Sequence, residues 1–225
     1  MLSHMVTRAP GRVLLTGTAL LTVAGSLAEA AAAVRAGADL VDLGGAGPAI
    51  IAAFRRAHPR TAVCSDAGPG DLVRHPQAAL AAGVLLLCPD AAAASGSGLP
   101  PGRLVVEVAP GGLPAVTAAG WAALVDADAA ADRARQVTGG ARERQAGSRQ
   151  RAAGSRTDDQ QTGGGEAAHD QQAAAAGIVA IAALSCWLGA TVVRTRHVRP
   201  VRRALDMSAS IRGDRPPARA VRGLA

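Results

Sequence analysis

The chain has 225 residues, of which 49% are hydrophobic and 18% are charged, and its formal net charge at pH 7 is +7. This is enough apolar material for the core of one α/β domain, built mostly from Ala, Val and Leu with a single Phe and no Tyr. All basic side chains are Arg, because the sequence contains no Lys. The lack of aromatic stacking platforms argues against single-stranded nucleic acid as a ligand, so we expect no nucleic-acid partner.

The three cysteines, Cys64, Cys88 and Cys186, lie far apart and each sits in an apolar run. This placement is typical of buried free thiols in a reducing compartment, and not of a disulfide or a metal site. The histidines show no metal-ligand spacing either, so we expect no protein-built metal centre.

The N-terminal segment permits two interpretations. Residues 13–30 have the features of a secretory signal peptide, with an apolar run at 13–24 and an A-x-A site at Ala28-Glu29-Ala30. The second interpretation is a buried strand over Val13–Thr16 that leads into a helix with Ser26 as N-cap and Gly37 as terminator. We favour the second, because cleavage at Ala30 would cut through an unbroken helical pattern.

From residue 39 onward, short apolar runs alternate with helical segments. Strands are predicted at 39–43, 61–65, 84–88, 103–108 and 121–125, and helices at 48–57, 70–82 and 113–119. Continuous apolar strands between helices indicate parallel strands that are covered on both faces. Gly37, Gly83, Gly120 and Gly189 each precede a strand, as expected for helix C-caps in repeated βα units.

The pattern stops at a polar stretch. Residues 129–172 contain scarcely a large apolar side chain, which predicts a disordered insertion between a first part, residues 1–128, and a closing part, residues 173–212. The tail at 213–225 is expected to be irregular. Residues 173–193 carry no charge, so they could cross a membrane, which would give a single-pass membrane protein with a signal peptide and a basic cytoplasmic tail. They also fit a helix, a turn at Gly189 and a strand at 190–194, followed by a helix at 201–211.

With the strand at 13–16, the second interpretation gives seven strands, so the sequence predicts a TIM-like (β/α) barrel that is shortened by about one βα unit. Ligands of such barrels bind at the C-terminal ends of the strands. Those ends carry Asp42, Asp66, Asp90, Asp126 and Arg194 in this sequence. Carboxylates there can accept hydrogen bonds from a heterocyclic ring, and an arginine can bind a phosphate.

Several of these strand ends resemble dihydropteroate synthase, the pterin-binding barrel of folate biosynthesis. The matching stretches, in chain order, are AAAAVRAGADLVDLGGAGP, TAVCSDAGPGDLVRHPQAALAAGVLLLCPD, RLVVEVAPGG, AAGWAALVDAD and AIAALSCWLGATVVRTRHVRPVRRALDM. They are similar to the family's "GAD-iIDiGG-S-P", "iSiDT…A..AL.aGa.iiND", "iilDPGiGF", the strand ending in "SRK", and the closing "a…Ga.iiRvHdV…al.m". The interval between Asp90 and Arg103 is short, which suggests that the fifth unit is missing.

The resemblance implies a transferase that condenses 6-hydroxymethyl-7,8-dihydropterin diphosphate with p-aminobenzoate in the cytoplasm, assisted by Mg²⁺. It implies that a pterin-type small molecule is the ligand, that no membrane is involved, and that a homodimer is an arrangement to test. The residues that it implies are Asp66, Asp90, Glu107 and Asp126 for the pterin, Arg194 for phosphate, and Arg194, Arg196 and His197 for catalysis. Gly44 and Gly45 are added as phosphate-binding candidates, because they form a glycine cluster at the start of a predicted helix. We expect Asp66, Asp90 and Arg194 to face one pocket.

The sequence departs from the family pattern at catalytic positions. Pro89 stands in place of an Asn, no residue can replace the family's Lys, Arg196 stands in place of the closing His, and TGTALLTVAG replaces the polar first loop. These departures predict impaired catalysis. They leave a non-catalytic pterin-binding barrel as the alternative function.

Overall fold

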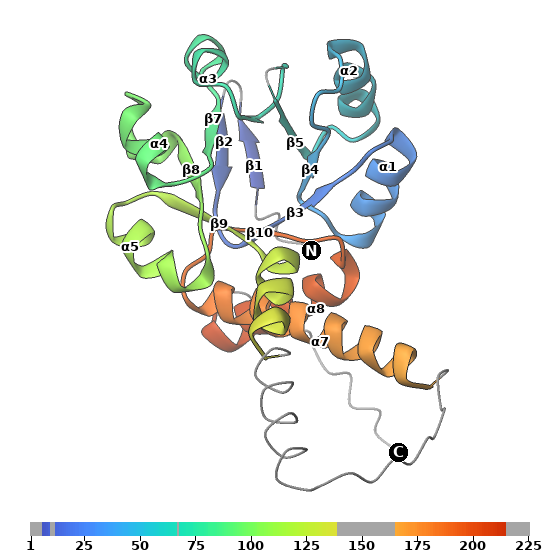
Figure 1. Ribbon diagram of the computed structural model, residues 1–225. Coiled ribbons are helices and arrows are strands. Elements are labelled where there is room, and N and C mark those ends of the chain that lie inside the picture. The colour runs from blue at the N-terminus through green and yellow to red at the C-terminus, as the bar shows by residue number, and fades with distance from the viewer. Residues whose placement is uncertain (1–5, 10–11, 67, 139–164, 215–225) are drawn as a thin grey trace, which may run out of the picture.

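The computed structural model describes residues 6–9, 12–66, 68–138 and 165–214, and it is a closed barrel of eight parallel strands in the order β10-β3-β4-β5-β6-β7-β8-β9 (Figure 1). The strands are β3 (Ala19–Val23), β4 (Leu40–Asp42), β5 (Ala62–Ser65), β6 (Leu72–Val73), β7 (Leu85–Cys88), β8 (Leu104–Glu107), β9 (Ala122–Asp126) and β10 (Val192–Arg194). The helices with described bounds are α1 (Leu27–Ala36), α2 (Pro48–Ala57), α3 (Pro76–Ala82), α4 (Ala91–Gly96), α5 (Leu113–Ala118), α7 (Gly165–Trp187) and α8 (Val198–Arg212). The predicted TIM-like barrel is therefore confirmed.

The strands bury apolar side chains on both faces, as parallel strands do. One cluster fills the barrel interior and includes Leu21, Leu40, Leu87, Val105 and Leu124. A second cluster lies between the strands and the helices outside them. Most members of both clusters are Ala, Val or Leu, so the helices can pack closely on the sheet without aromatic side chains.

The turns from helix to strand use the expected glycines. Gly37, Gly83, Gly120 and Gly189 all have positive φ, between 69° and 104°, which L residues with a side chain rarely adopt. Gly37 also donates its backbone N–H to the end of α1, at the Ala33 and Val34 carbonyls, while Ser26 caps the start of that helix through Glu29. The predicted caps of the first helix are confirmed.

The first barrel strand is β3 and not the predicted strand at 13–16. Residues 13–15 do form a strand, but it belongs to β2 (Arg12–Leu15), which pairs antiparallel with β1 (Val6–Ala9) in a separate hairpin. Both RVLL and ALLTV are short apolar runs, and only the second pairs with β4 and β10. The stretch TGTALLTVAG is therefore a barrel strand and not a substrate loop. The supposed cleavage site, Ala28 to Ala30, lies in the first turn of α1.

The eighth strand is β6, which lies in a segment predicted to be helix. The expected helix at 70–82 begins only at Pro76, because Leu72 and Val73 pair with the end of β5 and with β7. Parallel neighbours normally need a long crossover. Here a connection of six residues, 66–71, is enough. Strand β6 pairs only with the last two residues of β5, so the connection does not have to return along the whole length of β5. The interval between Asp90 and Arg103 contains α4, after which β8 pairs directly with β7.

The closing segment is a helix and a strand of the barrel. Helix α7 ends at Trp187, the turn follows at Gly189, and β10 pairs with β9 and β3 to close the barrel. The uncharged run at 173–193 is thus divided between two elements, as the barrel interpretation predicted. No helix in the described part of the chain has the length and apolarity that a membrane span requires.

The flanks of the polar insertion differ from the prediction. Residues 127–138 and 165–172 are helical, although 129–172 was expected to be disordered. The first flank is helical because Asp126 caps its start through the Ala129 N–H (2.8 Å) and because Ala127, Ala130 and Ala131 are buried. The rest of the insertion, residues 139–164, and most of the C-terminal tail lie outside the described residues.

Candidate functional site

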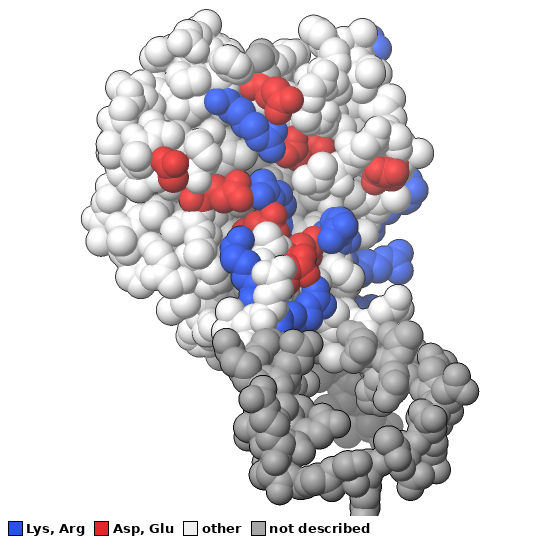
Figure 2. Space-filling model, viewed as in Figure 1, with Lys and Arg blue, Asp and Glu red and all other residues white. Residues whose placement is uncertain are grey.

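A layer of charged side chains lines the C-terminal mouth of the barrel. Inward-facing residues alternate along each strand, so the apolar interior positions Leu40, Val105, Leu124 and Val192 are followed two residues later by charged ones. The charged residues are Asp42 at the end of β4, Glu107 of β8, Asp126 of β9 and Arg194 of β10, joined by Asp66 after β5 and Arg74 after β6. We call these six residues the rim. Figure 2 shows acidic and basic side chains beside one another across the middle of this face.

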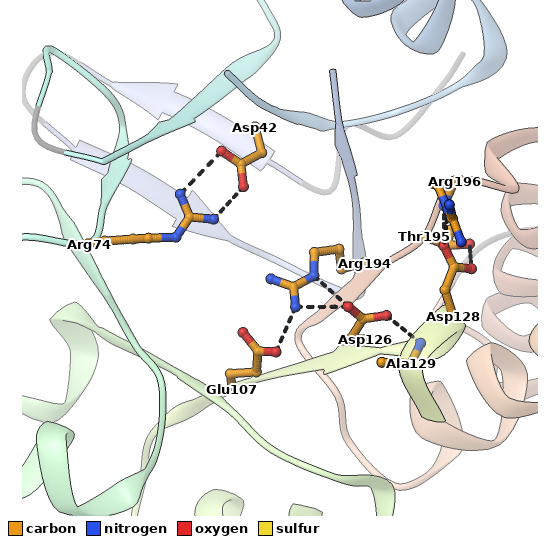
Figure 3. A network of polar contacts seen from close by, with 9 residues as sticks. All are labelled: Asp42, Arg74, Glu107, Asp126, Asp128, Ala129, Arg194, Thr195 and Arg196. Atoms are coloured by element: carbon orange, nitrogen blue, oxygen red, sulfur yellow. Dashed lines mark hydrogen bonds and ion pairs between the residues drawn. The ribbon is translucent and has the colours of Figure 1, made fainter. Parts of the chain in front are cut away.

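One half of the rim is organised by Arg74. Its guanidinium group forms two hydrogen bonds with the Asp42 carboxylate, from Nη2 to Oδ2 and from Nη1 to Oδ1 (3.3 Å), as Figure 3 shows. Nη1 also donates to Asp66 (2.9 Å). Asp42 is almost completely buried, with 3% of its side chain exposed, whereas Arg74 is one-third exposed. The hydrogen bonds to Asp42 raise the pKa of Arg74, so the guanidinium group keeps its charge.

The other half of the rim is organised by Arg194. Its Nη2 donates to Glu107 (2.6 Å), and its Nε donates to Asp126 (2.9 Å), so one guanidinium group joins three strands (Figure 3). Burial alone would lower the pKa of Arg194, but the negative charges of Glu107 and Asp126 outweigh it and the net shift is upward. The rim as a whole holds four carboxylates and two guanidinium groups, which leaves two negative charges in excess. A donor-rich ring suits this charge balance better than an anion does.

A second charged group lies beside the rim, at the start of α8. Asp128 accepts hydrogen bonds from the Thr195 hydroxyl and the Arg196 N–H, both 2.8 Å, and so fixes the loop between β10 and α8. Arg196 extends outward, with 78% of its side chain exposed. It borders a groove of about 510 Å³ between α1 and α8, whose floor is formed by alanines of α1 and whose edge includes His197 and Arg199.

The two cysteines at the barrel strands are held as neutral thiols. Burial, reinforced by the nearby Asp42 carboxylate, raises the pKa of Cys64 to about 12. Burial also raises the pKa of Cys88, and Asp90 contributes in the same direction. All three cysteines are free and buried, as the sequence suggested, so none is arranged as a nucleophile.

The structure brings most of the proposed site residues to one end of the barrel. Asp66, Glu107, Asp126 and Arg194 belong to the rim. Gly44 and Gly45 follow Asp42 directly, and the Gly44 N–H donates to the Asp42 carboxylate (2.9 Å).

Other proposed residues have structural partners or lie apart from the rim. The Asp90 carboxylate is used as the N-cap of α4, where it accepts the Ala93 N–H (2.7 Å). Arg196 and His197 lie at the groove beside α8. Arg194 was expected to meet an anion, and the anions that it contacts here are the carboxylates of Glu107 and Asp126.

Two residues of the site were missed by the sequence analysis. Arg74 was placed within a helix, because a two-residue strand has no recognisable period, so its position after an apolar pair was not read as a strand end. Asp128 is the last residue of the predicted first part, residues 1–128, and the sequence analysis gives it no role. A signal for it existed, because a carboxylate two residues after the Asp126 strand end lies in the first turn of the helix at 127–138.

The described residues contain no group of three or more His, Cys, Asp or Glu side chains that could hold a metal ion by themselves. Each rim carboxylate is already paired with an arginine. These residues therefore fit a Mg²⁺ ion only if substrate phosphates and water molecules supply most of its ligands.

The closed parallel barrel places this chain in the TIM-barrel class of folds, whose known ligand sites lie above the C-terminal ends of the strands. Within that class, the chain has the fold of dihydropteroate synthase. It is similar to the enzyme from Yersinia pestis, with 14% identity, a TM-score of 0.61, and coverage of 94% of this chain and 100% of that chain. No protein-family model matches the sequence, and no curated protein matches it at a significant level.

Two further structures of the same fold contain ligands. The dihydropteroate synthase from Xanthomonas albilineans with 4-aminobenzoic acid is 14% identical, with a TM-score of 0.63 and coverage of 93% of this chain and 98% of that chain. The enzyme from Coxiella burnetii in complex with pteroic acid is 13% identical, with a TM-score of 0.59 and coverage of 89% and 96%. At these identities, the likeness concerns the fold.

Proposed function

We propose that this chain is a dihydropteroate synthase-like protein of folate and pterin metabolism, which condenses 6-hydroxymethyl-7,8-dihydropterin diphosphate with p-aminobenzoate in the cytoplasm. The observation that supports this best is the rim, since its carboxylates lie at the end of the barrel where the fold binds ligands. The excess of carboxylates over guanidinium groups favours a ring that donates hydrogen bonds, as the amino group and ring N–H of a pterin do.

In the proposed reaction, the aniline nitrogen attacks the methylene carbon of the pterin, a C–N bond forms, the C–O bond to the diphosphate breaks, and pyrophosphate leaves while the amine loses a proton. Asp66, Glu107 and Asp126 would hold the ring, with Asp90 as a further candidate. Gly44, Gly45 and Arg194 would lie near the diphosphate, together with Arg196 and His197 from the groove. Mg²⁺ bound through the diphosphate would share its negative charge.

A second candidate is a barrel that binds a pterin without catalysing the condensation. The observations that favour it are the double pairing of Arg194 with carboxylates, which competes with phosphate, and the strand β3 where a substrate loop was expected. Without a covering loop, much of the organisation of the transition state would be lost.

The test combines binding with turnover. We expect 6-hydroxymethylpterin to bind wild-type protein in a calorimetric titration, and Asp66→Asn and Asp126→Asn to weaken it by about tenfold each through loss of charge-assisted hydrogen bonds. Asp132→Asn is the matched control, because Asp132 is exposed and, among the described residues, its ion pair is with Arg135 in the next turn. Pyrophosphate release that depends on p-aminobenzoate and Mg²⁺ supports the enzyme, and pterin binding without release supports the second candidate. No pterin binding at all contradicts both.

A homodimer is part of the same proposal. The C-terminal ends of α7 and α8 lie together, since Arg212 donates to the Cys186 carbonyl (2.7 Å). The exposed side chains there include Leu184, Trp187, Leu188, Met207 and Ile211, an unusual concentration of apolar surface. Light scattering on the purified chain would show whether it is a dimer.

A further inference from the structure

Arg74 contacts two carboxylates of the rim from a weakly anchored position. It follows β6, a strand of only two residues, and one-third of its side chain is exposed to solvent. By contrast, Arg194 is itself a residue of its strand, β10, and only 19% of its side chain is exposed. Of the two rim arginines, Arg74 is the one that can turn outward without opening the barrel.

The carboxylate beneath Arg74 is held rigidly. Asp42 ends a fully buried strand, and its Oδ1 accepts the Gly44 N–H (2.9 Å) independently of the arginine. If Arg74 turned away, Asp42 would keep its orientation but would be a buried charge without a cationic partner. Such a group binds strongly to any ligand that restores the lost hydrogen bonds.

The partner that Asp42 now has defines the ligand that could replace it. A guanidinium group presents two parallel N–H donors on an N–C–N unit, and a carboxylate accepts both. A 2-aminopyrimidin-4-one ring presents the same edge through its amino group and its adjacent ring N–H. The surroundings suit a planar ring, because the inward neighbours of Asp42 are the neutral thiol of its register partner Cys64 and the apolar side chains of Leu40 and Leu72.

We propose that Asp42 and Asp66 form a binding site for a cyclic guanidine, such as a 2-aminopyrimidin-4-one ring, and that Arg74 is its internal occupant in the free protein. A ligand of this type binds only after Arg74 leaves both carboxylates. The proposal rests on the proposed function for the identity of the natural ligand, a pterin, but the assignment of the site rests on the Arg74–Asp42 geometry alone.

The competition sets the affinity. The apparent dissociation constant of the ligand equals the intrinsic one divided by the fraction of molecules in which Arg74 has left. Removing the guanidinium group therefore tightens binding of a cyclic guanidine. If Arg74 instead orients the carboxylates for the ligand, removing it weakens binding, so the two roles predict opposite signs.

The experiment uses the full chain with two small probes, isocytosine as the isolated 2-aminopyrimidin-4-one ring and methylguanidine as the isolated arginine head group. We expect Arg74→Ala to bind isocytosine at least about tenfold more tightly than wild-type protein in a titration. We expect methylguanidine to raise the Tm of Arg74→Ala and to leave that of wild-type protein unchanged. Adding Asp42→Asn to Arg74→Ala should abolish both effects, because the acceptor carboxylate is gone.

The matched control is Arg55→Ala. Arg55 pairs with the mostly buried Asp71 (2.9 Å) between α2 and the β5–β6 connection, so its removal also takes an arginine away from a buried carboxylate, but not at the rim. Arg55→Ala should bind isocytosine no more tightly than wild-type protein does. If Arg74→Ala does not fold, Arg74→Gln keeps one amide donor for Asp42 and is read in the same way.

Isocytosine affinity that is unchanged or weaker in the Arg74 variants, with no stabilisation by methylguanidine, overturns the inference. Failure of the proposed function looks different. In that case, isocytosine and methylguanidine bind the Arg74 variant through Asp42, while 6-hydroxymethylpterin binds neither form of the protein.

Discussion

Arginine is suited to the rim because its planar fork can serve two carboxylates at once. Arg74 and Arg194 each contact two acids from different strands, which a point-like ammonium group would do less well. The rim therefore crosslinks the strand ends of β4, β8, β9 and β10 and the segments after β5 and β6. The same contacts occupy the groups that a ligand would need, so stability and binding are coupled at these residues.

The cysteines give a prediction on the alkaline side. The chain has neither Lys nor Tyr, so Cys side chains are the ones with an ordinary pKa between about 8 and 11. The pKa of Cys64 is raised to about 12, from 9.0, and that of Cys88 is also raised. Above pH 9, the unfolded chain loses these protons while the folded chain keeps them. The contribution of these thiols to stability is therefore constant below pH 9 and falls as the pH rises above it, for Cys64 by about 1.4 kcal/mol per pH unit up to about pH 12.

Urea unfolding at pH 8.0, 9.5 and 10.5 measures this slope, with these conditions chosen to bracket the unfolded-state pKa of about 8.5 to 9. Cys64→Ala should flatten the slope, and the Cys64→Ala/Cys88→Ala pair should flatten it further. If the double variant loses stability between pH 9.5 and 10.5 as steeply as wild-type protein does, the buried thiols are not the cause.

At the scale of the elements, several helices of the barrel are joined to the following strand by a short turn. A left-handed glycine separates the two in the units that end at Gly37, Gly83, Gly120 and Gly189. At Gly189, the N–H donates to the Cys186 carbonyl, and Ala190 donates to Ser185, so the end of α7 is satisfied before β10 begins. This turn directs β10 into the gap between β9 and β3.

Gly189→Ala should therefore destabilise the protein through backbone strain alone. A Cβ at Gly189 would meet only Thr117 at 3.5 Å, an ordinary contact, so the cost is that of placing Ala at φ 93°, about 1–2 kcal/mol. Gly177→Ala in the middle of α7 is the control with the opposite sign. Its Cβ meets nothing within 4 Å, and Ala gains about 0.5–1 kcal/mol over Gly inside a helix. Chemical denaturation measures the free energy of unfolding of both variants. Equal changes in that free energy would contradict the role proposed for the Gly189 turn.

At the scale of the whole molecule, the barrel could be predicted from sequence because its signals are local. Apolar runs, a Ser cap before Glu29 and a glycine before each strand are all read within a few residues. What failed depended on pairing over longer distances. RVLL and ALLTV both contain short apolar runs, and only the partners decide that the second is the barrel strand. The strand β6 has two residues, too few for any periodicity, and so Arg74 was not recognised.

The pairing of charges at the rim could not be predicted either. The sequence places carboxylates and one arginine at strand ends, but it does not say that Arg194 bonds to Glu107 and Asp126, 87 and 68 residues away. An arginine at a strand end therefore suggested a phosphate ligand equally well. The choice between a ligand and an internal partner depends on distances that only the folded barrel defines.

Barrel closure depends on one further ion pair, which joins the two ends of the fold. Asp39 accepts the Leu20 N–H (2.9 Å) at β3, and Arg202 of α8 bonds to both Asp39 and the Gly37 carbonyl (2.9 Å). Both side chains are about 15% exposed. Helix α8 is thereby fixed to the turn between α1 and β4, 163 residues earlier in the chain. A contact of this kind stabilises the closed barrel as a whole and not one element.

Arg202→Met should lower the free energy of unfolding by about 3 kcal/mol, because it leaves Asp39 mostly buried and without its cation. The control is Arg203→Met on the same helix. Arg203 is exposed and forms no ion pair within the described residues, so its loss should change stability by less than about 0.5 kcal/mol. Adding Asp39→Asn to Arg202→Met should recover part of the loss, since no buried charge then remains unpaired. Urea unfolding followed by circular dichroism measures all three. If Arg202→Met only loosens helix α8 and leaves the main unfolding transition unchanged, the contact stabilises that helix alone and does not contribute to barrel closure.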